Sequence, residues 1–263
     1  MGLAETYHYY NVEIADSRTN DWWLISTPLP LMIIIASYLY FVLSCGPRYM
    51  RDTKPYSLRT FLTCYNVFQI FYNTWIVYKL IIAGWLTYFG AVCNPMVIDY
   101  WLDPMAVQEA EITWWAMILK IIDLSETAVF VLRKKDRQIS FLHLYHHVTT
   151  VLIIWVTVKY FAGGICTFPV MLNSIVHVIM YTYYMLTARG PRIRRIMSLI
   201  KPYITGIQIV QFFVLLVHAS QGFSSSCDVP KAAVTVHITN LLINLYLFIH
   251  FYRKNYNSQK KTA

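Results

Sequence analysis

The chain has 263 residues, of which 57% are hydrophobic and only 13% charged, with a formal net charge of +9 at pH 7. Since soluble domains carry roughly 25% charged residues, this composition excludes an ordinary soluble fold and predicts an all-α polytopic membrane protein. A net charge of this size is also typical of nucleic-acid binding. The lysines and arginines, however, gather in a few short segments, as they do in the loops of membrane proteins.

Seven apolar stretches, each long enough to cross a bilayer as a helix of about 20 residues, follow one another along the chain. We expect these spans at about residues 24–45, 61–83, 114–132, 141–160, 166–187, 203–221 and 232–252. Their connections are short, which leaves no room for a separate soluble domain. We therefore predict one transmembrane domain over residues 1–263, with a lumenal N-terminus at 1–23 and a cytoplasmic tail at 253–263.

The charged residues predict the orientation of the spans. Most lysines and arginines lie at residues 48–59, 133–137, 189–201 and 253–261, whereas most acids lie in the other set of loops. The positive-inside rule then places the N-terminus in the lumen and the C-terminus in the cytoplasm. No apolar core precedes Trp22, so we expect no cleavable signal peptide. Lys260 and Lys261 form a dilysine pattern that predicts retrieval to the endoplasmic reticulum, against the alternative of an ordinary basic tail.

Two cysteines lie in predicted lumenal loops, where the compartment is oxidising. Cys93 follows the second span and Cys227 precedes the seventh, so we expect them to form a disulfide. Cys45, Cys64 and Cys166 lie in or beside spans and are interpreted as small buried hydrophobic residues.

Three histidines stand near the start of the fourth span. His143, His146 and His147 are spaced i, i+3, i+4, which places all three imidazoles on one face of a helix. A single histidine there would more simply be a buried residue with a satisfied hydrogen bond. Three on one face at membrane depth predict a polar cavity or a chemical role.

Other spans carry polar residues at helical spacing. In the third span they form one stripe, which is either a charge cluster between helices or part of a site. For Lys120 the charge cluster is at least as good an interpretation as the site. Amides in the sixth span are either helix-to-helix hydrogen-bonding groups or the wall of a channel. The residues are Lys120, Asp123, Glu126 and Thr127 in the third span, Asn173, His177, Met180 and Tyr181 in the fifth, and Gln208 and Gln211 in the sixth.

Two kinds of chemistry suit the histidines. The H-x-x-H-H pattern occurs in membrane di-iron desaturases and hydroxylases, but these need further histidine boxes, and His8, His218 and His237 lie near the other, lumenal side. The second kind uses a neutral imidazole as nucleophile toward a thioester, with neighbouring imidazoles as bases. Basic cytoplasmic loops would then bind the phosphates of coenzyme A.

Four ordered motifs give the chain a specific resemblance over nearly its whole length. It resembles the fatty acid elongases of the endoplasmic reticulum, the very-long-chain 3-oxoacyl-CoA synthases. His143–His147 is similar to their H-x-x-H-H box, Asn173–Tyr181 to N-x-x-H-x-x-M-Y, and Thr205–Gln211 to T-x-x-Q-x-x-Q. The family's K-x-x-E-x-x-D-T element departs from its pattern here, because Asp123 and Glu126 exchange their side-chain lengths.

The resemblance implies a fold, a reaction and partners. Helices two to seven would form a barrel around a substrate tunnel, with helix one outside. The enzyme would condense a long-chain acyl-CoA with malonyl-CoA, releasing CO2 and CoA, in a multi-pass endoplasmic reticulum membrane protein that needs no metal or redox cofactor. It would work beside the ketoreductase, dehydratase and enoyl reductase of the elongation cycle.

The resemblance also implies residue roles. His146 would hold the acyl group, His177 would face it across the tunnel and assist malonyl decarboxylation, and His143 and His147 would orient and tune them. Substrate contacts are expected from Lys120, Asp123, Glu126, Asn173, Tyr181, Gln208 and Gln211, with Arg133, Lys134, Lys135 and Arg253 binding the CoA phosphates.

Overall fold

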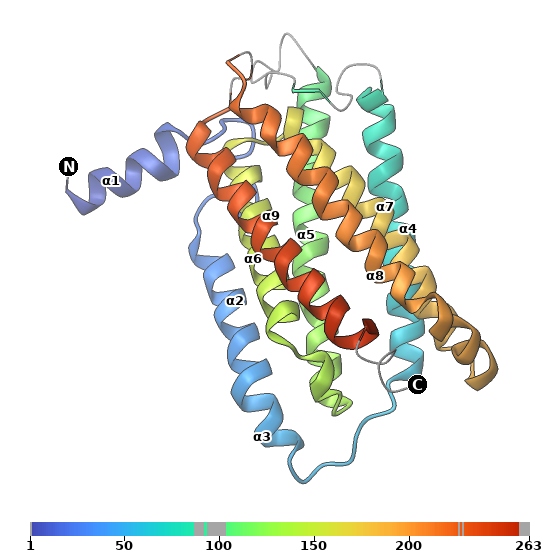
Figure 1. Ribbon diagram of the computed structural model, residues 1–263. Helices are drawn as coiled ribbons and strands as arrows, with labels where there is room; N and C mark the ends of the chain where they lie inside the picture. Colours follow the sequence, from blue (N-terminus) through green and yellow to red (C-terminus); the bar gives the residue numbers. More distant parts are fainter. Residues whose placement is uncertain (1, 87–91, 94–103, 226, 228, 258–263) are drawn as a thin grey trace. The chain divides into compact units, whose positions relative to one another are not determined.

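The computed structural model describes residues 2–86, 92–93, 104–225, 227 and 229–257, and the regular structure in these ranges is helical (Figure 1). The chain forms two compact units, each built from two separate stretches of sequence. Unit 1 comprises residues 1–57 and 96–167, and unit 2 comprises residues 58–95 and 168–263.

Unit 1 contains an N-terminal region and the two helices that carry the histidine box and the polar stripe. Its elements are α1 (Leu3–His8), η1 (Tyr9–Glu13), α2 (Leu29–Tyr40), η2 (Phe41–Cys45), α3 (Gly46–Met50), α5 (Pro104–Leu132), η4 (Asp136–Gln138), α6 (Phe141–Tyr160) and η5 (Gly164–Cys166). Helices α5 and α6 pack together, and η2 and α3 pack against α5. Pro28 and Pro30 lie at the start of α2, where a helix tolerates a missing N–H.

Unit 2 contains four long helices. Its elements are α4 (Arg59–Ile82), α7 (Thr167–Thr187), α8 (Pro191–Ser220), η6 (Gln221–Phe223), α9 (Lys231–Tyr252) and η7 (Arg253–Asn257), with Thr167 at the boundary of the units. Ring contacts join α7 to α8 through Phe168 and His218, 4.1 Å between centroids, and α8 to α9 through Phe212 and Phe248, 5.0 Å. A disulfide joins Cys93 to Cys227, the pairing that their predicted loop positions indicated, with their Cα atoms 5.9 Å apart.

Helices occupy all seven predicted spans, and the protein is an all-α polytopic membrane protein. Within the described residues, five helical segments are long and apolar enough to cross a membrane: Leu29–Met50, Phe141–Tyr160, Gly164–Thr187, Pro191–Phe223 and Lys231–Tyr256. Helices α4 and α5 are more polar, since their buried faces carry amide and charged side chains. The count of seven crossings therefore stays a prediction.

Two helices begin earlier than the sequence indicated. Helix α5 begins at Pro104 rather than near Trp114, and α8 begins at Pro191 rather than near Tyr203. The basic segment 189–201, which we expected to be a loop, is therefore mostly helical. Hydropathy detects the apolar part of a helix, whereas arginine and lysine are good helix formers that extend it beyond that part. Pro202 lies inside α8.

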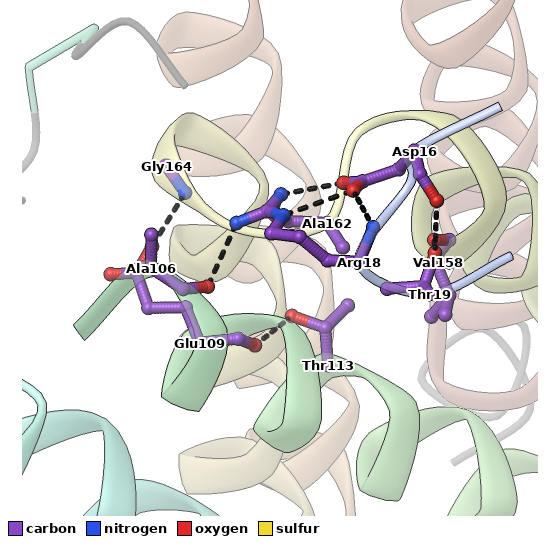
Figure 2. Close-up of polar contacts among 9 residues, drawn as sticks. All are labelled: Asp16, Arg18, Thr19, Ala106, Glu109, Thr113, Val158, Ala162 and Gly164. Carbon is purple, nitrogen blue, oxygen red and sulfur yellow. Dashed lines mark hydrogen bonds and ion pairs between the residues drawn. The ribbon is translucent and has the colours of Figure 1, made fainter. Parts of the chain in front are cut away.

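Residues 16–26, which we call the N-terminal docking segment, bind the end of α6 far from its histidines. The Asp16 amide donates to the Lys159 carbonyl at 2.9 Å, and the Thr19 hydroxyl donates to the Val158 carbonyl at 2.6 Å. Figure 2 shows Arg18 between the Asp16 carboxylate and the backbone of α5 and the turn after α6. Its guanidinium donates to the carbonyls of Ala106 and Ala162.

A buried lysine makes the second attachment of this segment. Lys159, in the last turn of α6, is 0% exposed, and its ammonium donates to Asn20 Oδ1 at 2.5 Å and to the Ile25 carbonyl at 3.0 Å. The indole of Trp155, one turn earlier, donates to the Leu24 carbonyl at 2.7 Å. The docking segment thus supplies oxygen partners for a charge that would otherwise be buried alone.

The turn that follows α6 depends on a glycine. Gly163 has a φ of +111°, and a Cβ there would lie 2.8 Å from Glu109 Oε2. The same carboxylate oxygen accepts from the Gly164 amide at 2.9 Å, as Figure 2 shows. A side chain at position 163 would therefore strain the backbone and displace Glu109.

We predict that Arg18→Met lowers the thermal stability of the purified protein. The change leaves Asp16 buried without its guanidinium, a loss that costs about 3 kcal/mol or more in buried ion pairs. Tryptophan fluorescence during heating of the detergent-solubilised protein measures the melting temperature. Arg137→Met, which removes an exposed arginine of the same unit, is the control and should leave the melting temperature unchanged. Equal melting temperatures for the two variants would contradict the assigned role.

We predict that labelling with a thiol reagent shows three free cysteines before reduction and five after it. Denatured, unreduced protein should take up a maleimide on Cys45, Cys64 and Cys166, whereas reduced protein should take it up on all five cysteines. Cys227→Ser frees Cys93 and should add one label to the unreduced protein. Labelling of all five cysteines without reductant would show that the bond is absent.

Candidate functional site

The three histidines of α6 occupy its first two turns. Ser140 caps the helix by accepting from the His143 amide at 3.2 Å, and the helix starts at Phe141. The rings of His143 and His147 lie 4.2 Å apart between centroids, and those of His146 and His147 lie 5.9 Å apart. All three side chains are half-buried, so the predicted shared face exists and forms one run of imidazoles.

Helix α5 holds the first of these rings. Thr127 is fully buried, and its hydroxyl lies 2.8 Å from Nε2 of His143. Phe130, one turn further along α5, contacts the same ring at 5.3 Å. The polar stripe of the third span and the histidine box are therefore joined by a direct hydrogen bond.

The charged part of the stripe lies deeper along α5. Lys120 is 8% exposed and Asp123 2%, and their Nζ and Oδ2 atoms lie 3.2 Å apart, the i, i+3 pair that the spacing predicted. Glu126 is half-buried one residue before Thr127. The pair keeps an ammonium and a carboxylate inside the protein, with each compensating the charge of the other.

In unit 2, α7 and α8 carry the second set of predicted residues. His177 and Tyr181 are buried and contact each other at 5.6 Å between ring centroids. Met180 accepts from Gln208 Nε2 at 3.4 Å, which links α7 to α8. Gln211 is buried and Asn173 half-buried. The motif predicted one continuous face of α7. Met180 connects this face to α8, and Tyr181 connects it to α4.

A polar ladder on α4 was missed from the sequence. Gln69 Nε2 donates to Tyr65 Oη at 2.9 Å, and Asn73 Nδ2 donates to Gln69 Oε1 at 3.1 Å. All three side chains are buried, and the Tyr65 ring lies 5.9 Å from that of Tyr181. Their i, i+4, i+8 spacing was the available signal, since one helix face repeats at that interval.

The predicted phosphate-binding residues lie at helix ends. In unit 1, Lys134 and Lys135 are exposed and Arg133 is half-buried where α5 ends. Lys134 has a φ of +53°, and the amide of Lys135 donates to the Phe130 carbonyl at 2.9 Å, which closes a Schellman turn. In unit 2, Arg253 is exposed just after α9. Lys260 and Lys261 lie outside the described residues.

The chemistry available to these residues is that of imidazole, hydroxyl and amide groups. The α6 histidines supply candidate nucleophiles and bases, and the amides of unit 2 supply hydrogen-bond donors. Among the described residues, no group of three histidine, cysteine or acidic side chains is placed to hold a metal ion.

Comparison with known proteins identifies similar chains. The model of the family described as ELO: GNS1/SUR4 matches residues 23–263. A very long chain fatty acid elongase of Aedes aegypti is 37% identical over 262 residues, which are 99% of this chain and 72% of that protein. Very long chain fatty acid elongase 7 of Rattus norvegicus is 36% identical over 98% of this chain and 92% of its own. Very long chain fatty acid elongase 1 of Homo sapiens is 38% identical over 94% of this chain and 88% of its own.

We predict that the Lys120–Asp123 pair can be tested by removing one or both charges. Asp123→Leu leaves the ammonium buried and should destabilise the protein by about 3 to 5 kcal/mol. The double variant Lys120→Met with Asp123→Leu removes both charges at similar volume and should recover most of that loss. Thermal unfolding measures both, with exposed Asp136→Leu as the control. A double variant less stable than Asp123→Leu would contradict the pairing.

Proposed function

This chain belongs to the ELO (GNS1/SUR4) family, and we propose that it is the condensing enzyme of very long chain fatty acid elongation. The enzyme would join a long-chain acyl-CoA to malonyl-CoA and release CO2, CoA and a 3-oxoacyl-CoA. The observation that supports this most directly is the run of imidazoles on α6, held by a hydrogen bond from α5. Its sequence is the H-x-x-H-H box.

The first half of the reaction uses His146 as nucleophile. The unprotonated ring nitrogen of a neutral His146 attacks the thioester carbonyl, and the C–S bond breaks. CoA leaves as thiolate and takes up the proton that the other ring nitrogen loses. The product is an acyl-imidazole with a C–N bond between the acyl carbon and the ring. A half-buried imidazole suits this role, because a neutral ring keeps a lone pair on one nitrogen and can reach a substrate that enters the site.

The second half uses malonyl-CoA. Loss of CO2 leaves the electron pair on the α-carbon of acetyl-CoA as an enolate, which attacks the acyl carbon. The C–N bond to His146 then breaks, and the released ring takes up a proton from water, which restores the neutral imidazole. His177 assists decarboxylation by stabilising the enolate oxygen. Asn173, Gln208 and Gln211 bind the thioester or pantetheine region, and Tyr181 fixes the His177 ring by direct contact.

The remaining assignments follow the charge placement. Arg133, Lys134, Lys135 and Arg253 bind the phosphates of CoA, while Lys120, Asp123 and Glu126 support the site. The reaction needs neither a metal nor a redox cofactor, because an imidazole and a β-carboxylate supply the nucleophile and the electron pair. We place the protein in the endoplasmic reticulum membrane with its C-terminus cytoplasmic, beside the ketoreductase, dehydratase and enoyl reductase that process its product.

We expect a covalent acyl-enzyme when metal-stripped protein meets a long-chain acyl-CoA without malonyl-CoA. Intact-protein mass spectrometry should show the added acyl mass, and peptide mapping should place it on His146. His146→Ala should form no adduct and no product. His177→Ala should still form the adduct but should fail to convert it when malonyl-CoA is added.

The controls separate this mechanism from its competitors. An active wild-type enzyme without an adduct would indicate direct attack by the enolate in a ternary complex. Activity that appears only when iron is restored would overturn the metal-free proposal and favour a histidine–metal oxidase. An unchanged rate in His146→Ala would remove that residue as the nucleophile.

We predict that Arg133→Ala raises the KM for acyl-CoA with little change in kcat. The guanidinium binds a phosphate that is equally charged in the ground state and the transition state, so its loss weakens binding uniformly. We expect about a tenfold rise, as for loss of a charge-assisted hydrogen bond. Initial rates against acyl-CoA concentration measure it, and an unchanged KM would move CoA binding to another basic segment.

A further inference from the structure

We propose that Tyr38, in the first span, is a positioning residue that holds His143 in one neutral tautomer through Thr127. The proposal concerns the histidine run to which the proposed function assigns catalysis, and in that respect it rests on that function. It adds a residue of α2, which the resemblance places outside the barrel, to the groups that prepare the site.

The contacts form a continuous path within unit 1. The Tyr38 hydroxyl donates to Thr127 Oγ1 at 2.9 Å, and the same oxygen lies 2.8 Å from Nε2 of His143. Tyr38 and Thr127 are both buried. Both contacts have normal hydrogen-bond lengths, so each of them joins one donor to one acceptor.

The number of protons along this path determines which nitrogen of the His143 ring is protonated. A hydroxyl has one proton, and Thr127 Oγ1 already receives the proton of Tyr38. Thr127 Oγ1 has a second lone pair and could also accept from an Nε2–H, but its own buried proton would then lack an acceptor among the described contacts. The arrangement that gives every proton of the path an acceptor has Thr127 donating to Nε2 of His143. A ring that accepts at Nε2 carries its proton on Nδ1 and is neutral, since an imidazolium has N–H groups on both nitrogens.

The same contact fixes the orientation of the ring. The plane of His143 is set by the direction of Nε2 toward Thr127, and this ring lies 4.2 Å from that of His147. His147 in turn contacts His146 at 5.9 Å. Tyr38 thereby influences the proposed nucleophile through two ring contacts without touching the substrate.

A nearby tyrosine provides the matched control. Tyr40 belongs to the same helix, two residues along, but is 62% exposed, whereas Tyr38 is 8% exposed. Replacing either by phenylalanine removes one hydroxyl and leaves the ring in place. A difference between the two variants therefore reports the hydrogen bond rather than the loss of an aromatic residue.

Magnetic resonance of ring-labelled protein tests the tautomer directly. The full chain is labelled with ¹³C,¹⁵N-histidine, and the His143 signals are identified by their loss in His143→Gln. The wild-type ring should be protonated at Nδ1, and Tyr38→Phe should give a mixture in which Nε2 is also protonated. Tyr40→Phe should match the wild type. A wild-type ring protonated at Nε2, or an unchanged ring in Tyr38→Phe, would overturn the proposal.

Kinetics of condensation give a second readout. Tyr38→Phe and Thr127→Val should each lower kcat about fivefold, the loss typical of one neutral hydrogen bond, with KM unchanged. Because both act through one path, the double variant should be no slower than Thr127→Val alone. Thr127→Ser restores the hydroxyl and should restore most of the rate. Additive losses, or a lowered melting temperature at unchanged kcat, would mean a merely structural role.

The two proposals fail in different ways. A wild-type protein without condensing activity would contradict the proposed function, while the tautomer experiment would still decide the state of His143. An active wild type whose kcat is insensitive to Tyr38→Phe would contradict the positioning role alone.

Discussion

Charged side chains that leave water must find their partners inside the protein, and three cationic side chains in the described part of unit 1 do so. Arg18 meets Asp16 and two backbone carbonyls, Lys120 meets Asp123, and Lys159 meets oxygens of the N-terminal docking segment. An unpartnered buried charge costs more free energy than most packing contacts provide. The contacts of Arg18 and Lys159 therefore fix how residues 16–26 lie against α5 and α6, while the Lys120–Asp123 pair, which lies within α5, compensates two charges of that helix.

Helix α6 is consequently held at both ends. At its start, the Ser140 cap and the Thr127 hydroxyl define the position of the histidine turns. At its other end, the contacts of Trp155 and Lys159 with the docking segment prevent the helix from sliding or rotating. A run of imidazoles keeps a constant geometry only on such a fixed helix, which is the condition for preorganised catalysis.

Local spacing and hydropathy predicted much of this arrangement, because they depend on neighbours in the sequence. The shared face of His143, His146 and His147 and the position of the spans follow from helical periodicity. Tyr38 and Arg18 could not be found in this way, since their roles depend on residues about 90 positions away. The barrel of six helices remains a prediction from family resemblance.

The division of the chain into interleaved units orders its assembly during synthesis. Unit 1 is complete once residue 167 has been made, whereas α4 belongs to unit 2 and must wait for α7 to α9. During that wait, Gln69 and Asn73 already have hydrogen-bond partners within their own helix. For the crossing predicted at α4, the ladder pairs buried amide groups within the helix itself before its neighbours arrive. The Cys93–Cys227 bond forms only after the α8–α9 turn has been translated.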